Sequence, residues 1–149
     1  MLPEKPDRIP SVASVMTPFP WTIGVDEPLA RAKEMMLTND FRHLPVVEGT
    51  TLVGVVTDRD VHVAENSVPD PETRQRLKVS DGLMRDAYVV GIHEPVDIVM
   101  EEMANRHIGF ALVVKDERLA GIFTASDACM RFSDFLRRMF PPDGDDDVA

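Results

Sequence analysis

The chain has 149 residues, enough for one domain or for two small domains that share a core. Hydrophobic residues make up 44% and charged residues 28% of it, which is ordinary for a soluble globular protein. The formal net charge of −10 argues against non-specific binding to nucleic acid or to an anionic membrane, because both need a basic face.

The cysteine and histidine residues argue against disulfide, metal and thiol chemistry. The single cysteine, Cys129, excludes an internal disulfide and a cysteine-rich metal site. We expect Cys129 to be a small buried residue, because no sequence neighbour would activate its thiol. The histidines lack a ligand-like spacing, so we expect no metal site. No stretch reaches transmembrane length and the start lacks a signal-peptide core, which predicts a cytoplasmic protein.

The first half of the chain predicts a strand, a helix, two strands and a second helix. Residues 1–10 are rich in proline and charge, and we expect a flexible lead-in there. The prolines Pro18 and Pro20 then bar a helix and favour an extended segment. The expected elements follow at residues 22–25, 28–39, 44–47, 52–57 and 58–66.

The second half repeats this order after a connector over residues 67–78. Its elements are expected at residues 89–92, 95–104, 111–114, 119–124 and 125–140. The last helix is longer than its counterpart, and an acidic tail over 141–149, predicted to be disordered, follows it. Large apolar residues late in this helix predict a further interface, the alternative being that they cover the same core: Phe132, Phe135, Met139 and Phe140.

The clearest repeat is the segment Leu52–Asp60, which returns at Leu119–Asp127, 67 residues later. Both copies have the pattern Gly-x-x-Thr-x-x-Asp after a short apolar run, which predicts a buried strand that leads into a helix. One interpretation is a capping box that only stabilises the helix start. The other is a nucleotide site, because helix N–H groups bind phosphate and a carboxylate accepts from ribose hydroxyls.

The repeat has the marks of a known family. Met16-Thr17-Pro18, Leu44-Pro45-Val46-Val47 and the Gly54–Asp60 pattern, with their second copies, resemble a tandem pair of cystathionine-β-synthase (CBS) domains, or Bateman module. The resemblance implies an α/β (α+β) fold of two βαββα repeats packed through their sheets around a pseudo-two-fold axis. The two CBS domains would span residues 11–66 and 79–140.

The resemblance also implies two clefts for adenosine-type ligands. The residues implied for one cleft are Thr57, Asp60, Ala87, Tyr88 and Val89, and those implied for the other are Thr124, Asp127, Pro20, Trp21 and Thr22. The aspartates would bind ribose, the threonines would help with phosphate, and the adenine would lie against the extended start of the opposite unit. Arg42 and His43 would reach the phosphates.

The two copies differ in charge. The second copy has Gly109-Phe110 and Ala125-Ser126 where the first has Arg42-His43 and Asp58-Arg59. Positive charge is thus concentrated in the first copy, and a polyphosphate would need that charge or a metal. We therefore expect unequal clefts, a slight lead for the one with Asp127, and a monophosphate or uncharged adenosine compound at least as readily as ATP.

Several of these residues also have simpler interpretations. Arg42 and His43 could be solvated residues at a strand entrance. Trp21 could pack at the core edge, and Arg59 could merely decorate its helix.

The favoured function is a non-catalytic regulatory module that binds AMP, ADP, ATP, S-adenosylmethionine or an NAD-type molecule and signals to an effector protein. The alternative is a dimeric interaction scaffold that binds no nucleotide. An enzyme is disfavoured, because the sequence offers no paired general acid and base. The family-typical assembly is a homodimer, which the apolar helical faces favour.

Overall fold

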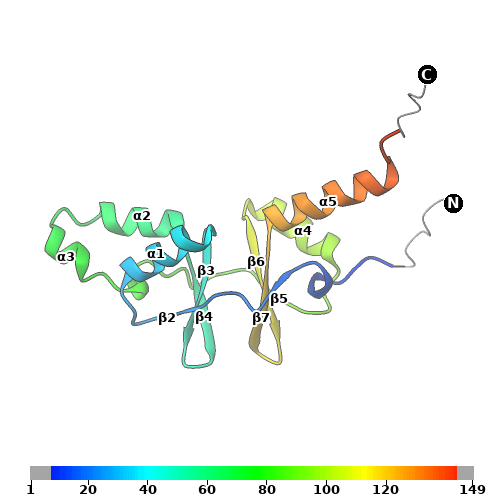
Figure 1. The fold of residues 1–149 in the computed structure, drawn as a ribbon. Coiled ribbons are helices and arrows are strands. Elements are labelled where there is room, and N and C mark those ends of the chain that lie inside the picture. The colour runs from blue at the N-terminus through cyan, green and yellow to red at the C-terminus, as the bar shows by residue number, and fades with distance from the viewer. Residues whose placement is uncertain (1–7, 144–149) are drawn as a thin grey trace, which may run out of the picture.

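Residues 8–143 are described by the structure, which is a computed structural model (Figure 1). Residues 1–7 of the predicted lead-in and residues 144–149 of the predicted acidic tail lie outside the described residues. Two sheets stand side by side in the middle of the molecule, and the helices of each half lie on the outer side of its sheet (Figure 1).

The predicted order of elements is confirmed in both repeats. The first contains β2 (Ile23–Gly24), α1 (Leu29–Asn39), β3 (His43–Glu48), β4 (Thr51–Thr57) and α2 (Asp58–Asn66). The second contains β5 (Val89–Gly91), α4 (Val96–Arg106), β6 (Phe110–Lys115), β7 (Arg118–Thr124) and α5 (Ala125–Met139). Ahead of each repeat lies a 3-10 helix, η1 (Val12–Ser14) or η2 (Val79–Asp81), and η1 is followed by the short strand β1 (Thr17–Pro18).

The connector holds a helix that the sequence analysis missed, α3 (Pro71–Gln75). Pro71 occupies the first helical position, where its missing N–H would have no helical partner in any case. The Asp70 carboxylate caps the helix by accepting from the backbone N–H groups of Glu72 and Thr73 at 3.3 and 3.4 Å. Pro71, which favoured an irregular connector in the sequence, therefore begins a helix.

The two sheets follow the same plan. In the first, β2 is parallel to β3 and β3 is antiparallel to β4; in the second, β5 is parallel to β6 and β6 is antiparallel to β7. Ile23 lies opposite Val46 in the first sheet, and Val90 lies opposite Val113 in the second, at the same offset of 67 residues as the sequence motifs. The matching registers express the pseudo-two-fold relation between the repeats.

The segments ahead of each repeat pack into the opposite repeat. Val12 is fully buried in the core under α4, and its N–H donates to the Glu94 carbonyl at 2.8 Å. Val79 is fully buried in the core under α1, and its N–H donates to the Glu27 carbonyl at 2.8 Å. Strand β1 also joins the sheet of the second repeat, beside β7, as the blue segment in Figure 1 shows. The two repeats thus share their cores through exchanged segments.

The glycine of each repeated motif lies where an exchanged segment crosses the sheet. Val55 and Met84 exchange two backbone hydrogen bonds at 2.9 and 3.0 Å, and a Cβ on Gly54 would collide with the Met84 carbonyl oxygen. In the second repeat, a Cβ on Gly121 would stand 2.8 Å from the Thr17 carbonyl oxygen. Glycine is therefore required by close backbone approach.

Three apolar clusters stabilise the module. One lies between α1, α2 and the first sheet, and a second lies between α4 and the second sheet. The third lies between the two sheets and contains Val55 of β4 together with Phe110, Leu112 and Ile122 of β6 and β7. This third cluster confirms that the repeats pack through their sheets, and burial of its large side chains stabilises the module by about 1.5–3 kcal/mol each.

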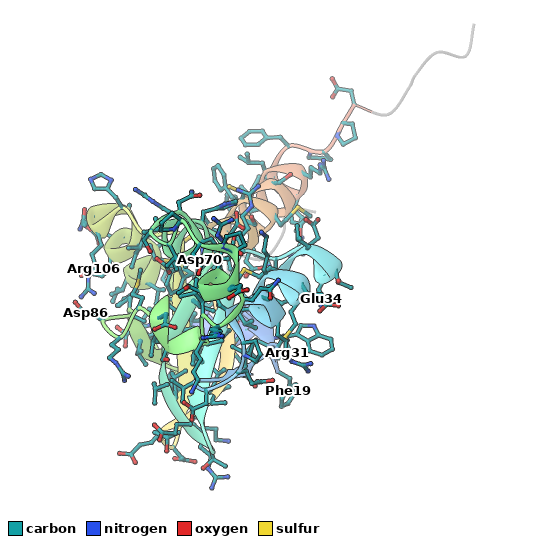
Figure 2. All side chains as sticks on the ribbon, turned by 90° about the vertical axis from the view of Figure 1, so that its left-hand side faces the viewer. Phe19, Arg31, Glu34, Asp70, Asp86 and Arg106 are labelled. Carbon is teal, nitrogen blue, oxygen red and sulfur yellow. The ribbon has the colours of Figure 1, made fainter. Side chains whose placement is uncertain are left out.

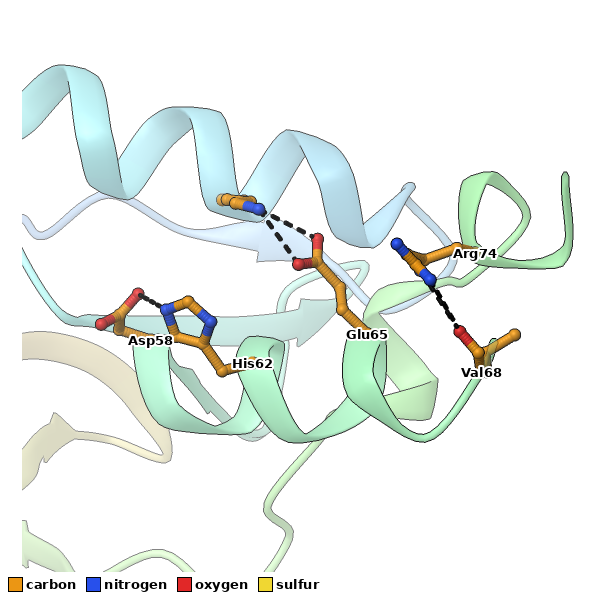
Figure 3. A network of polar contacts seen from close by, with 6 residues as sticks. Asp58, His62, Glu65, Val68 and Arg74 are labelled. Atoms are coloured by element: carbon orange, nitrogen blue, oxygen red, sulfur yellow. Dashed lines mark hydrogen bonds and ion pairs between the residues drawn. The ribbon is translucent and has the colours of Figure 1, made fainter. Parts of the chain in front are cut away.

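Polar contacts on the outside of the first repeat supplement this packing (Figure 3). Lys33 of α1 pairs with Glu65 of α2 at 3.0 Å, and His62 lies 3.8 Å from Asp58 within α2. Arg74 of α3 donates to the Val68 carbonyl at 3.1 Å. Partly exposed contacts of this kind contribute about 1 kcal/mol or less each, so the apolar clusters decide the fold.

Helix α5 extends away from the body of the molecule (Figure 1) and has no buried residue. Cys129 is exposed on it, so the prediction of a buried cysteine was wrong, because the helix leaves the core soon after its first turn. The large exposed side chains on or just after this helix are Met130, Phe132, Phe135, Leu136, Met139 and Phe140. These side chains do not cover the core of their own repeat.

Candidate functional site

Both repeated motifs form complete capping boxes. Thr57 Oγ1 accepts from the N–H of Asp60 at 3.1 Å, while Asp60 Oδ2 accepts from the N–H of Thr57 at 3.0 Å. The same pair of bonds joins Thr124 and Asp127 at 3.2 and 2.9 Å. The capping interpretation is therefore correct in structural terms. It does not exclude a ligand, because the cap uses one of the two carboxylate oxygens.

The second carboxylate oxygen distinguishes the two motifs. Asp127 Oδ1 accepts from Thr17 Oγ1 at 3.3 Å, a long contact that brings the exchanged N-terminal segment to the motif of the second repeat. The residue that follows Met84, the counterpart of Met16, is Arg85 rather than threonine. No such threonine contact can therefore form at Asp60.

A cleft of about 690 Å³ opens at the start of α5. Its volume suits a small-molecule ligand. The walls come from both repeats: the segment after β1, the end of α1 and the start of β3 on one side, and β7 with the first turn of α5 on the other. The lining residues are Thr17, Pro20, Trp21, Asp40, Phe41, Arg42, His43, Gly109, Ile122, Thr124, Ala125, Ser126 and Asp127.

The lining of this cleft includes groups that can bind an anion. Arg42 is exposed, and within residues 8–143 its guanidinium forms none of the four salt bridges. The first turn of α5 presents Ala125 and Ser126, without an acidic side chain ahead of Asp127. The first turn of α2 instead begins with Asp58, whose negative charge opposes an anion at that helix start. The start of α5 therefore has one acidic residue in its first turn, Asp127, whereas the start of α2 has two, Asp58 and Asp60.

His43 lies between this cleft and the contact of the two repeats. It begins β3 opposite Thr57, and its ring centroid is 4.6 Å from that of Phe110, which begins β6. Burial lowers the pKa of His43 below its ordinary value, the neighbouring Arg42 lowers it further, and Asp60 partly offsets them. The imidazole is therefore predominantly neutral near pH 7.

The same lining also includes aromatic side chains. Trp21 is 60% exposed and is not among the residues of the three described apolar clusters, which argues against the alternative that it packs at the core edge. Pro20 and Phe41 are also in the lining, and Phe41 packs against the core of the first repeat. Thr22, which the resemblance placed with them, is exposed and lies outside the lining. Flat rings of this kind can lie against a base.

The residues expected for the second cleft include both partly buried and exposed side chains. Tyr88 packs at the edge of the core under α4, and the Arg106 guanidinium lies 4.8 Å from the centroid of its ring. Burial raises the pKa of the Tyr88 hydroxyl, and the negative charges of the nearby Glu102 and Glu94 raise it further. Val89 is 44% exposed at the start of β5, and Arg59 is exposed on α2. Phe110 is buried where the first repeat has His43.

Seven residues of the α5 cleft lining were not predicted as binding residues: Thr17, Asp40, Phe41, Gly109, Ile122, Ala125 and Ser126. Thr17 donates a hydrogen bond to Asp127, and Ile122 lies opposite Thr17 on the neighbouring strand β7. Asp40 ends α1 in the left-handed conformation, with φ of 55°, which turns the chain toward Arg42. The Met-Thr-Pro motif could have indicated Thr17, but no local pattern marks Asp40 or Ile122 as cleft residues.

Within residues 8–143, no group of three or more histidine, cysteine, aspartate or glutamate side chains could hold a metal ion. No helix in the same range is long and apolar enough to cross a membrane.

Comparison with known proteins finds one family. The CBS domain model matches the chain twice, at residues 12–65 and 79–134. A CBS domain-containing protein of Dictyostelium discoideum is 31% identical over 125 residues, which are 78% of this chain and 86% of that protein. An inosine-5'-monophosphate dehydrogenase of Thermoplasma acidophilum is 30% identical over 112 residues, but the match spans only 21% of the enzyme.

Solved structures share the whole architecture. A protein described as AcuB, for acetoin utilization, from Vibrio cholerae has a TM-score of 0.79 and 27% identity, covering 87% of this chain and 95% of that chain. The CBS domain pair of protein MJ0100, in complex with methylthioadenosine and S-adenosyl-L-methionine, has a TM-score of 0.74 and 25% identity. The match covers 86% of this chain and 99% of the MJ0100 chain.

Proposed function

The chain belongs to the CBS domain family as a tandem pair of these domains, and we propose that it is a regulatory module that binds an adenosine-containing ligand. The observation that carries this proposal is the cleft at α5, whose lining includes Trp21 and Arg42 as well as Asp127 of the second repeat. The ligand of the MJ0100 domain pair, S-adenosyl-L-methionine, contains adenosine and supports the proposal.

The cleft offers protein groups that would bind the ribose, the base and the phosphate of such a ligand. The Asp127 carboxylate would accept from the ribose hydroxyls, with Oδ1 released from its long contact to Thr17. The base would lie against Trp21. Arg42, Ser126 and the N–H groups at the start of α5 would bind a phosphate.

The charge of the lining favours few phosphates. Asp40 and Asp127 bring two negative charges, against the single permanent positive charge of Arg42. A triphosphate would add more negative charge to this lining than a monophosphate, and an adenosine compound without phosphate would add none. We therefore propose AMP or S-adenosylmethionine ahead of ADP, ATP or an NAD-type molecule.

A ligand in this position would act on both repeats at once. Its base would contact the first repeat, its ribose would contact the second, and its phosphate would contact both, so binding would favour one relative arrangement of the two. An effector protein that reads this arrangement would then respond to the ligand concentration. The proposed role is non-catalytic.

The test uses Trp21, which is the only tryptophan of the chain. Titration with AMP, ATP, S-adenosylmethionine or NAD is expected to change its fluorescence in a saturable manner for at least one compound. A thermal-shift measurement with the same compounds provides an independent readout, because a ligand that binds only the folded state raises the melting temperature. If no compound changes either signal, the module does not bind adenosine ligands.

The exposed apolar face of α5 favours a second candidate, a dimeric interaction scaffold. Phe132 and Phe135 are 61% and 51% exposed, and their rings lie 6.4 Å apart on one side of the helix. Apolar faces of this kind are typical of interfaces. We propose that two copies pair through this face, whether or not a ligand is bound. Silent ligand titrations with an intact dimer would favour the scaffold over the sensor.

A further inference from the structure

His43 stands where the α5 cleft meets the boundary between the repeats. Among the described residues, the cleft lining has two side chains that can carry a positive charge, His43 and Arg42. We propose that a phosphate-bearing ligand enters this cleft together with one proton, which is taken up by the His43 imidazole. This inference rests on the proposed function and adds a pH dependence to it.

The charge balance of the lining supports the proposal. A nucleoside monophosphate brings close to two negative charges at neutral pH. Arg42 supplies one positive charge, and Asp40 and Asp127 add two negative ones. A neutral imidazole could donate one hydrogen bond, whereas an imidazolium donates from both nitrogens and also supplies the second positive charge.

The surroundings of His43 hold its ring neutral while the cleft is free. Arg42 precedes it in the chain, Asp60 of α2 acts on its charge, and Asp40 at the end of α1 and Asp127 of α5 line the same cleft. The strand residues against it, Thr57 and Phe110, do not titrate in this range.

Burial and Arg42 outweigh Asp60 and lower the pKa of His43. A phosphate would add negative charge and raise the pKa of His43 above its value in the free cleft.

The sign of the effect follows from linkage. Because the pKa of His43 would be higher with phosphate bound than without, phosphate binding tightens as the pH falls between these two values. Below the pKa of the free protein, the ring is charged both with and without phosphate, and binding tightens no further through His43. Between the two pKa values, the dissociation constant changes by about tenfold per pH unit at most. Adenosine, which lacks the phosphate, would bind without this dependence.

The experiment is calorimetric titration of the full chain with AMP near neutral pH, in two buffers of different ionisation enthalpy. The difference in heat counts the protons taken up on binding. His43→Gln is the matched variant, because glutamine keeps a hydrogen-bond donor and cannot titrate. The phosphate of AMP also titrates, near a pKa of about 6, but it contributes equally in both proteins. Adenosine is the control ligand.

The expected result is an uptake approaching one proton with AMP that disappears in His43→Gln, and no His43-dependent uptake with adenosine. Equal proton uptake by both proteins would overturn this inference and leave the proposed function standing. Absence of binding by AMP and adenosine alike would refute the inference together with a simple adenosine or monophosphate site. If the variant does not fold, the imidazole resonance of His43 is titrated in the wild type. A pKa unchanged by bound AMP would also refute it.

Discussion

Replacing Gly54 by alanine tests the exchange of segments between the repeats. The new Cβ would occupy the position where the Met84 carbonyl oxygen passes over β4. This oxygen accepts from the N–H of Val55 at 3.0 Å, and the N–H of Met84 donates to the Val55 carbonyl at 2.9 Å. The methyl group cannot be accommodated unless the crossing segment moves away from the strand.

The expected loss of stability combines two effects. Weakening both hydrogen bonds is expected to cost about 1–3 kcal/mol, at about 0.5–1.5 kcal/mol each. Overpacking against backbone adds about 1–3 kcal/mol. Partial relaxation keeps the total below the sum of the upper limits, so we expect the free energy of unfolding to fall by about 2–5 kcal/mol. For a chain of this size, the melting temperature would fall by roughly 5–15 °C.

Urea unfolding followed by circular dichroism measures this change. Gly91→Ala is the matched control, because nothing lies within 4 Å of a Cβ built on Gly91 in strand β5. The control is expected to change the free energy of unfolding by less than about 0.5 kcal/mol. If Gly54→Ala unfolds like the control, Met84 does not cross β4 as described, and the account of the shared core is wrong.

Two further predictions concern ligand and assembly. Arg42→Gln should weaken binding of AMP by about tenfold or more, because a charge-assisted bond to phosphate is lost, while adenosine binds unchanged. Equal loss for both ligands, measured by fluorescence titration, would argue against a phosphate contact. Phe135→Ser should convert a dimer to a monomer in light scattering with little change in stability. Phe19→Ser is its control, since Phe19 is 93% exposed and lies away from α5 (Figure 2). A monomeric wild type at micromolar concentration would contradict the dimer.

The regular elements could be predicted because their signals are local. Apolar residues at helical spacing located α1 and α4, and the capping threonines Thr57 and Thr124 fixed the starts of α2 and α5 to the residue. The recurrence of one motif at a fixed offset then predicted two equivalent units.

The exchange of segments could not be predicted in the same way. The sequence predicted Val12 and Val79 at the beginnings of their own repeats. No local sequence pattern indicates that each is buried under helices of the other repeat. The same limit applies to Asp40, which reaches the cleft only through the left-handed end of α1. The burial of Cys129 was predicted wrongly for a related reason, since residue type alone does not show that α5 leaves the core.

The site was predicted in part. Trp21, Arg42 and Asp127 line one cleft, as the resemblance implied. Thr22 is exposed and lies outside this lining, and it precedes β2, whose first residue, Ile23, is buried.

The most direct test of the account is calorimetric titration of AMP and S-adenosylmethionine into the wild type, Asp127→Ala and Asp60→Ala. Both variants lose the same capping box, at a similar cost in stability of about 0.5–2 kcal/mol, so each controls for the folding effect of the other. The account predicts one ligand per chain, lost in Asp127→Ala and kept in Asp60→Ala. Absence of binding in the wild type, or loss of binding in Asp60→Ala alone, would contradict it.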